Sequence, residues 1–206
     1  MGMDEHEAWQ EAQMEEYARK AVEDGIEDIK NNAISHHFFY YGADIERRVT
    51  ERIKASKELT KLGFYGEALT SAYTAIELTI RWCFIRPLSL ASFMEDEMAD
   101  VIVSHILPRH SSSRDRDLFP KLMKHWGLEI DTLTLANEKG LWKSLKTDVM
   151  PARNQFVHRA SKTDETTAEL GVEIAELLFQ EAIKMFGGRD NRLGSASQSM
   201  SIDHLT

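Results

Sequence analysis

Residues 64–86 read FYGEALTSAYTAIELTIRWCFIR, and this stretch decides the fold class of the chain. Its apolar side chains recur every three or four residues, at Ala68, Ala72, Ala75, Ile76, Leu78, Trp82 and Cys83. That spacing predicts a helix whose wide apolar face is typical of a central position in a bundle. Pro87 comes directly afterwards, and we expect it to end the helix because proline lacks a backbone N–H group.

The segments before this stretch also favour helices. Residues 4–31 are rich in Glu, Ala, Gln and Lys and predict a helix with an acidic, solvated face, for which the Asn pair at its end is the expected stop. An aromatic connector over residues 35–42 comes next. A second helix over residues 43–62 follows it, with Gly63 as the expected C-cap.

The segments after Pro87 predict further helices joined by polar loops. Their expected ranges are 93–107, 117–126, 137–147, 151–160 and, after a turn in which Thr163 or Asp164 provides the N-cap, about 165–186. No segment alternates apolar and polar residues over the length of a strand, so we expect no sheet. The sequence therefore predicts an all-α protein.

Composition divides the 206-residue chain into three parts. Residues 1–42 form an acidic N-terminal helix with its aromatic connector, residues 43–187 form the helical domain, and residues 188–206 form a flexible polar tail. Ten acidic and only two basic residues stand among residues 1–28, so this segment carries a net charge of −8 out of −9 for the whole chain. The helical domain is therefore almost neutral and has room for a local basic surface.

Composition also excludes several classes of protein. No apolar run approaches the ~20 residues of a membrane-spanning helix, and the acidic N-terminus does not resemble a signal peptide. A net charge of −9 argues against a broadly basic nucleic-acid-binding protein. The single cysteine, Cys83, cannot form an intrachain disulfide. These features favour a cytoplasmic protein without membrane contact.

Residues 151–159, PARNQFVHR, carry the side chains that we expect to perform chemistry. Pro151 suits the first turn of a helix, where Arg153 lies near free backbone N–H groups and can clamp a phosphate with them. Asn154 and His158 are four residues apart and share a helix face. Because an imidazole transfers protons near neutral pH, a phosphate clamp beside His158 is what RNA cleavage without a metal requires.

The spacing between Arg153 and His158 is weak support by itself. Thirteen arginines and eight histidines produce about half such a pair by chance, and this pair is the only one with that spacing in the sequence. The alternative is an ion-paired arginine at a helix start and a histidine that packs against a neighbouring helix.

The motif, together with the long amphipathic helix expected after it, resembles the HEPN family (higher eukaryotes and prokaryotes nucleotide-binding domain). Residues 63–77 and Arg81 resemble the early helix of that family, which commonly carries a small-residue face and a glutamate, here Glu77. The resemblance covers roughly residues 43–187. It implies an all-α, HEPN-like helical bundle, to which this chain adds an acidic N-terminal helix.

The resemblance also implies a function. HEPN proteins usually dimerise, and their two Arg–His motifs meet in a cleft at the two-fold interface. Many members are ribonucleases that act without a metal or other cofactor in toxin–antitoxin, phage-defence and RNA-processing systems. In this chain Arg153 and His158 match the catalytic pair, Asn154 matches the polar residue after the arginine, and Glu77 matches the supporting glutamate. Ala160 stands where some toxin members carry a tyrosine that the antitoxin modifies, so the chain departs from that subgroup.

The expected partners are therefore RNA, a second copy of the chain that completes a composite active site, and an antitoxin or regulatory protein. Phosphate contacts dominate nucleic-acid affinity, so basic residues are the expected RNA contacts. Five are candidates: Arg109, Arg114, Arg116, Arg159 and Lys162. The first three stand in a polar loop that is also consistent with simple solvation, because Asp115 and Asp117 partly offset its charge.

Several alternatives stay open at this point. A non-catalytic HEPN-like domain would bind RNA or a nucleotide through the same motif. A helical interaction protein would instead use the apolar stripes of residues 64–86 and 165–186. The acidic N-terminal helix would either cover a basic cleft as an RNA mimic or serve solubility, and the aromatic residues 36–41 would either stack on bases or fill the core. No spaced set of Cys, His and carboxylate residues predicts a metal site.

Overall fold

The structure is a computed structural model, and it describes residues 5–92 and 118–187. Within these ranges the chain is helical apart from turns, loops and one isolated bridge between Thr134 and Gly140, so the predicted all-α fold is confirmed. None of the helices in these ranges is both long and apolar enough to cross a membrane. Three predicted segments lie outside the described residues: the helix 93–107, the basic loop 109–117 and the tail 188–206.

The first helix, α1 (Glu5–Lys61), is continuous, so the predicted stop at Asn31–Asn32 and the predicted connector over residues 35–42 are both wrong. Tertiary packing overrides the weak local signal of the two asparagines. The second half of α1 buries side chains at helical spacing against the bundle: His37, Phe38, Ile45, Val49 and Ile53. The predicted end of this helix is confirmed, since Gly63 follows it with a φ of 80°.

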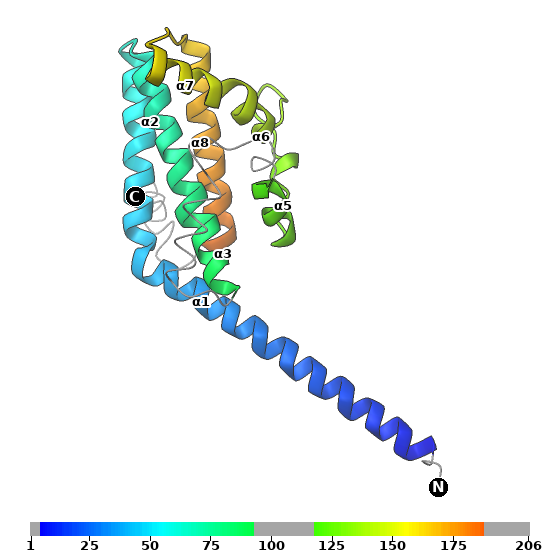
Figure 1. Cartoon of the computed structure of the whole chain (residues 1–206). Helices are drawn as coiled ribbons and strands as arrows, with labels where there is room; N and C mark the ends of the chain where they lie inside the picture. Colours follow the sequence, from blue (N-terminus) through cyan, green and yellow to red (C-terminus); the bar gives the residue numbers. More distant parts are fainter. Residues whose placement is uncertain (1–4, 93–117, 188–206) are drawn as a thin grey trace, which may run out of the picture.

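The N-terminal part of α1 projects away from the bundle (Figure 1). The described side chains from Ala12 to Ile29 are all exposed. Lys30 contacts the bundle, with its Nζ 5.6 Å from the centroid of the Trp126 ring. We call residues 5–29 the stem. The stem points away from the other end of the bundle, where α7 lies, so it does not cover the predicted motif of its own chain.

The aromatic residues of α1 are divided between core and solvent. Phe38 is buried and stacks on Phe186, with 5.2 Å between the ring centroids. Phe39, Tyr40 and Tyr41 are exposed. The prediction that the aromatic run fills the core therefore holds for Phe38 and fails for these three, because consecutive residues point to different sides of a helix.

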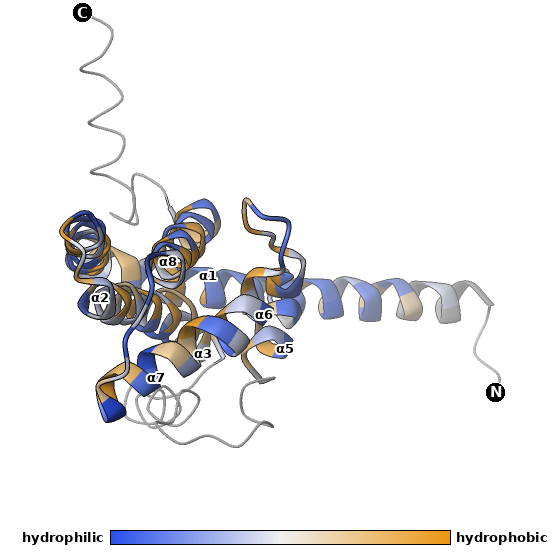
Figure 2. Cartoon of the chain, turned by 90° about the horizontal axis from the view of Figure 1, so that it is seen from above, coloured by the Kyte–Doolittle hydropathy of each residue, from blue (hydrophilic) through white to orange (hydrophobic). Residues whose placement is uncertain are grey.

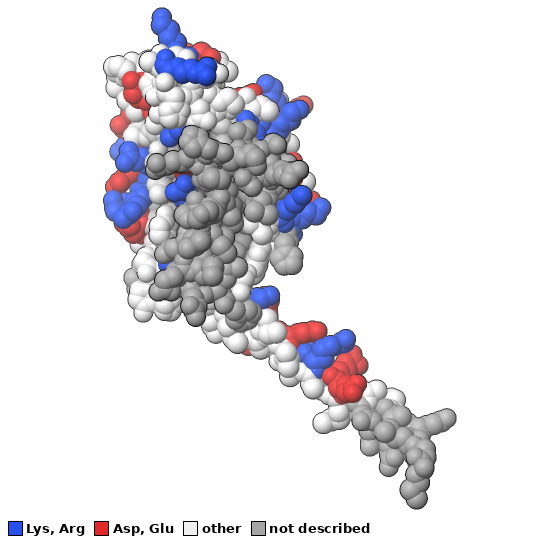
Figure 3. Space-filling model, viewed as in Figure 1, with Lys and Arg blue, Asp and Glu red and all other residues white. Residues whose placement is uncertain are grey.

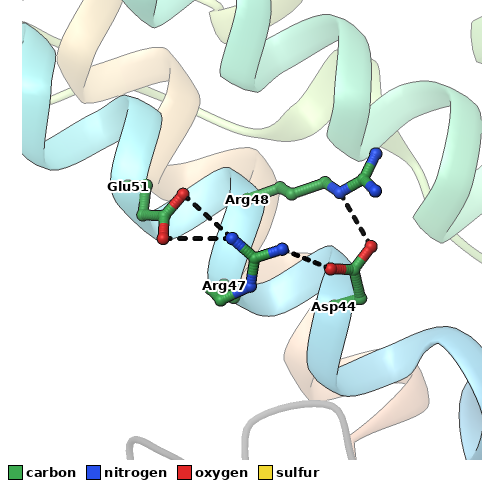
Figure 4. A network of polar contacts seen from close by, with 4 residues as sticks. All are labelled: Asp44, Arg47, Arg48 and Glu51. Carbon is green, nitrogen blue, oxygen red and sulfur yellow. Dashed lines mark hydrogen bonds and ion pairs between the residues drawn. The ribbon is translucent and has the colours of Figure 1, made fainter.

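An exposed network of ion pairs lies on α1 where it runs along the bundle (Figure 4). Arg47 donates to Asp44 at 2.5 Å and to Glu51 at 3.2 Å, and Arg48 pairs with Asp44 at 2.7 Å. The hydrogen bond to Asp44, followed by that to Glu51, raises the pKa of Arg47. Such exposed pairs contribute little to stability, and their role here is to keep the outer face of α1 hydrated.

The core lies between α1, α2 (Tyr65–Leu78) and α8 (Glu165–Phe186), which Figure 2 shows nearly end-on. Helices α2 and α8 approach closely at Gly171, where an added Cβ would lie 2.8 Å from Cδ1 of Leu69. The predicted central position of α2 is therefore confirmed. Its buried residues are Gly66, Ala68, Leu69, Ser71, Ala72, Ala75 and Ile76.

The central helical run does not end at Pro87 as predicted. It continues from α2 through the π-helix η1 (Thr79–Ile85) into α3 (Arg86–Ala91). Backbone hydrogen bonds in η1 span five residues, as from the N–H of Arg86 to the carbonyl of Arg81. The carbonyl of Trp82 would accept the next bond, but Pro87 has no N–H. Nε2 of His37 donates to that carbonyl at 2.9 Å and replaces the missing bond.

The following segment contains α5 (Leu118–His125) and the short 3₁₀ helix η3 (Ile130–Thr132). The helix predicted over residues 137–147 starts later, because residues 135–138 form a turn and Gly140 forms a bridge with Thr134. Oδ1 of Asn137 accepts the N–H of Lys139 at 3.0 Å, and Glu138 has a φ of 63°. The helical run then begins with α6 (Leu141–Ser144) and passes through the π-helix η4 (Leu145–Val149) into α7 (Met150–Arg159).

The connection from α7 to α8 agrees with the sequence. Ala160 has a left-handed backbone with a φ of 50°, which ends α7. Asp164 caps α8, since its Oδ1 accepts the N–H of Thr167 at 2.8 Å. This hydrogen bond lowers the pKa of Asp164.

Candidate functional site

The predicted motif lies on α7, at the end of the bundle opposite the stem (Figure 1). Pro151 stands in the first turn of α7, as predicted. However, η4 leads directly into α7, and Val149 already has helical backbone angles. The first N–H groups of α7 therefore follow helical residues, unlike those at an isolated helix start. The predicted clamp between Arg153 and free backbone N–H groups is wrong for this reason.

Two contacts fix α7 on α2. The ring of Phe156 lies against Gly66, where an added Cβ would be only 2.0 Å from its Cε2 atom. The Arg153 guanidinium lies over the ring of Tyr73, with 5.1 Å between Cζ and the ring centroid. This distance is that of a cation–π interaction. The two contact residues on α2 are two turns apart, so together they set the direction in which α7 crosses it.

Arg153 and Asn154 form a pair that presents hydrogen-bond donors. Nη1 of Arg153 donates to Oδ1 of Asn154 at 3.1 Å. This bond uses the acceptor of the amide and leaves its NH₂ group able to donate. No Asp or Glu of the described residues forms an ion pair with Arg153. A half-buried cation and an exposed amide donor therefore lie together without an anionic partner from the described chain.

His158 lies one helical turn beyond Asn154, in the last turn of α7. Both side chains are exposed and share a helix face, as predicted from their spacing. Within the described residues His158 has no hydrogen bond or ion pair that fixes its ring. Val157, next to it, is 45% exposed. The surface around His158 is thus open to a ligand or to another protein chain.

Glu77 lies on α2, one turn from Tyr73. Its carboxylate is 4.0 Å from the guanidinium of Arg81, and both side chains are about one-third exposed. It is Tyr73 rather than Glu77 that contacts Arg153. The supporting role that the resemblance implies for Glu77 therefore remains a prediction.

Arg159 and Lys162 are exposed at the end of α7 and in the segment that leads to α8. Acidic residues share this region. The charge of Glu165, together with burial and a hydrogen bond to its carboxylate, raises the pKa of Tyr65. Figure 3 shows Lys and Arg atoms beside Asp and Glu atoms at this end of the molecule, so the surface is mixed in sign. Three of the predicted RNA contacts lie outside the described residues: Arg109, Arg114 and Arg116.

The described residues offer neither a metal site nor a reactive thiol. No group of three or more His, Cys, Asp or Glu side chains there could hold a metal ion. Cys83 is fully buried, and burial raises the pKa of its thiol far above the usual range. A thiolate nucleophile at this position is therefore excluded.

No protein-family model, no curated protein and no solved structure matches the chain. These comparisons do not bear on the resemblance to HEPN proteins. The functional argument therefore rests on the side chains of α7 and their neighbours on α2.

Sequence reasoning missed the residues that hold the motif in place. The sequence places Tyr73 and Gly66 within the central helix and Phe156 within the motif, but it assigns none of them a contact. A signal was present for Tyr73, since it lies four residues before Glu77 and therefore on the same face of α2. No sequence signal indicates that Phe156 meets Gly66, because that contact depends on how α7 crosses α2.

Proposed function

We propose that this chain is a metal-independent endoribonuclease of the HEPN type, acting in a toxin–antitoxin or phage-defence setting. The observation that carries the proposal is the environment of Arg153. Its guanidinium rests on Tyr73 and bonds Asn154, but it has no carboxylate partner among the described residues. An arginine in this state is suited to bind a phosphate, because guanidinium and phosphate form strong charge-assisted hydrogen bonds.

The proposed reaction is attack of the RNA 2′-oxygen on the adjacent phosphorus, which breaks the bond to the 5′-oxygen. The products are a 2′,3′-cyclic phosphate and a 5′-hydroxyl. One proton leaves the 2′-hydroxyl and one joins the departing 5′-oxygen, so no oxidant or further reactant is required. Arg153 would stabilise the charge on the phosphorane-like transition state, Asn154 would orient the scissile group, and His158 would transfer protons.

The two proton transfers favour a homodimer with a composite site. One histidine as base and a second as acid would serve the two oxygens at once, and each chain supplies one His158. The exposed Val157 beside it gives this face an apolar element suited to a second copy. Arg159 and Lys162 would contact flanking phosphates of the RNA, and no cofactor is needed in this scheme.

The test is cleavage of several classes of RNA by purified protein in the presence of a chelator. We expect His158→Ala and Arg153→Ala each to lower the cleavage rate by about 10²–10⁴-fold, as expected for loss of a general acid–base or a charge-stabilising group. His36→Ala and Arg48→Ala are matched controls, because both residues are exposed on α1, whereas the motif residues of α7 contact α2.

Three results would contradict this function. Cleavage that survives in His158→Ala would show that the activity comes from elsewhere. Absence of cleavage by the wild type on every RNA class, with RNA affinity that falls in Arg153→Ala, would instead indicate a non-catalytic RNA-binding domain. Behaviour unchanged by either substitution would indicate a helical interaction protein.

A further inference from the structure

The stem of α1 carries an apolar stripe that is exposed from Met14 to Ile29 and continues to Ala33, which is half-buried. Its three large side chains are far from buried: Met14 is 70% exposed, Val22 is 62% exposed and Ile29 is 55% exposed. Steps of four, four, three, four and four residues place six side chains within about 100° of one helix face. These six are Met14, Ala18, Val22, Gly25, Ile29 and Ala33. Figure 2 shows hydrophobic positions recurring along the otherwise hydrophilic stem.

A helix with this stripe requires a partner. Most of the stability of helices in proteins comes from packing an apolar face rather than from helix propensity. The described side chains of the stem between Ala12 and Ile29 are all exposed, so its own bundle does not supply that packing. Exposed apolar surface that continues over several turns is typical of protein–protein interfaces.

The charges along α1 indicate what the partner is and how it runs. Residues 5–16 contain five Glu and no Lys or Arg, whereas residues 31–42 contain no Asp, Glu, Lys or Arg. A parallel second copy would place the five carboxylates of each chain side by side. An antiparallel second copy, with residue 14 opposite residue 33, places them beside the uncharged segment instead. Like charges repel, so the antiparallel arrangement is favoured.

The sizes of the side chains in the stripe fit the same register. Ala18 comes opposite Ile29 of the second copy, Val22 comes opposite Gly25, and Met14 comes opposite Ala33. Each layer therefore combines a large residue with a small one, which lets two helices approach closely without leaving voids. A parallel pair in register would instead place small against small and large against large.

We propose that two copies of the chain pair antiparallel through residues 14–33 of α1, related by a two-fold axis near residues 23 and 24. The interface is self-complementary, as a two-fold axis requires. It lies at the opposite end of the bundle from α7 and does not depend on the proposed ribonuclease site.

The register is tested by disulfide formation in the full-length protein under mild oxidation. The double variant Ala18→Cys with Ile29→Cys is expected to form a covalent dimer, because these positions face each other across the antiparallel pair. Each single variant is expected to stay uncrosslinked, since positions 18 and 18 of the two copies are separated by about 16 Å along the helix axis. Cys83, the one native cysteine, is fully buried and does not interfere.

The outcomes are distinct from those of the ribonuclease test. A disulfide in the single variant Ala18→Cys would show parallel pairing and overturn the proposal, as would the absence of a disulfide in the double variant. Val22→Glu should abolish the cross-link in the double-cysteine background, while Asn31→Glu, the same charge change on the other face of the helix, should leave it. His158→Ala should also leave it, so failure of one proposal does not imply failure of the other.

Discussion

Replacing Gly66 by Ala tests how α7 is held on the bundle. An added Cβ would lie 2.0, 2.3 and 2.5 Å from three atoms of the Phe156 ring, whereas ordinary contact begins at 3.4 Å. The ring must therefore retreat by 3.4 − 2.0 = 1.4 Å, and α7 moves with it because Phe156 belongs to that helix. Overpacking of this kind costs about 1–3 kcal/mol. Replacing a helical glycine by alanine stabilises the helix by about 1 kcal/mol.

The net expectation is a loss of about 0–2 kcal/mol in the free energy of unfolding, measured by urea denaturation. The sharper measurement is the coupling with Phe156. In a Phe156→Ala background the ring is gone, so Gly66→Ala should become neutral or stabilising, with a coupling energy of about 1–3 kcal/mol. An equal effect of Gly66→Ala in both backgrounds would refute the proposed docking of α7 on α2.

Three further predictions follow from single contacts. Asp164→Ala should lower the free energy of unfolding by about 1 kcal/mol at pH 7, because it removes the N-cap of α8, whereas Asp164→Asn should largely retain it. The pKa of Asp164 is lowered in the folded state, so its contribution to stability is present above about pH 4 and is lost as the pH falls further. The free energies of unfolding of wild type and Asp164→Asn, measured as a function of pH, should therefore diverge only in that acidic range. Cys83 should resist thiol reagents in the native protein and react on unfolding in guanidinium, so rapid native reaction would contradict its burial. His37→Phe should cost about 1–3 kcal/mol by leaving the Trp82 carbonyl without a donor, and less in a Pro87→Ala background, where a backbone N–H is restored.

The all-α class and the central helix were predictable because they depend on local periodicity. The face of residues 64–78 repeats at helical spacing, and the structure buries that face against α1 and α8. The cap of α8 by Asp164 was predictable for the same reason, since capping depends on residues only three apart. Local rules therefore succeed where the interacting residues are close in sequence.

The failures share one physical cause, which is contact between distant segments. The asparagine pair at 31–32 does not stop α1, because buried residues further along the helix pack against α2, α3 and α8. Pro87 does not end the central run, because His37 donates a hydrogen bond to the carbonyl of Trp82. His37 stands 45 residues before Trp82 in the sequence. No local rule includes such a donor.

The candidate site was predictable in its residues but not in its geometry. The spacing of Asn154 and His158 correctly places them on one exposed face of α7. The role of Tyr73 under Arg153 could not be predicted, because it depends on how α7 crosses α2. The free helix start was predicted wrongly, because proline marks the first turn of α7 even though helical residues precede it.

The separation of the stem from α7 has a consequence for affinity. Because α7 lies at the end of the bundle opposite the stem (Figure 1), two chains joined by their stems would carry their α7 faces at far ends, and each proposed composite site would form with α7 of a further chain. If the α7 ends bind RNA as proposed, such an assembly is multivalent: once one end has bound a long RNA, the other end searches only the volume within its reach. The effective concentration of that other end for a second segment of the RNA is set by the rigid length of the helices rather than by the protein concentration. Long transcripts would then be retained more strongly than short fragments with the same local sequence.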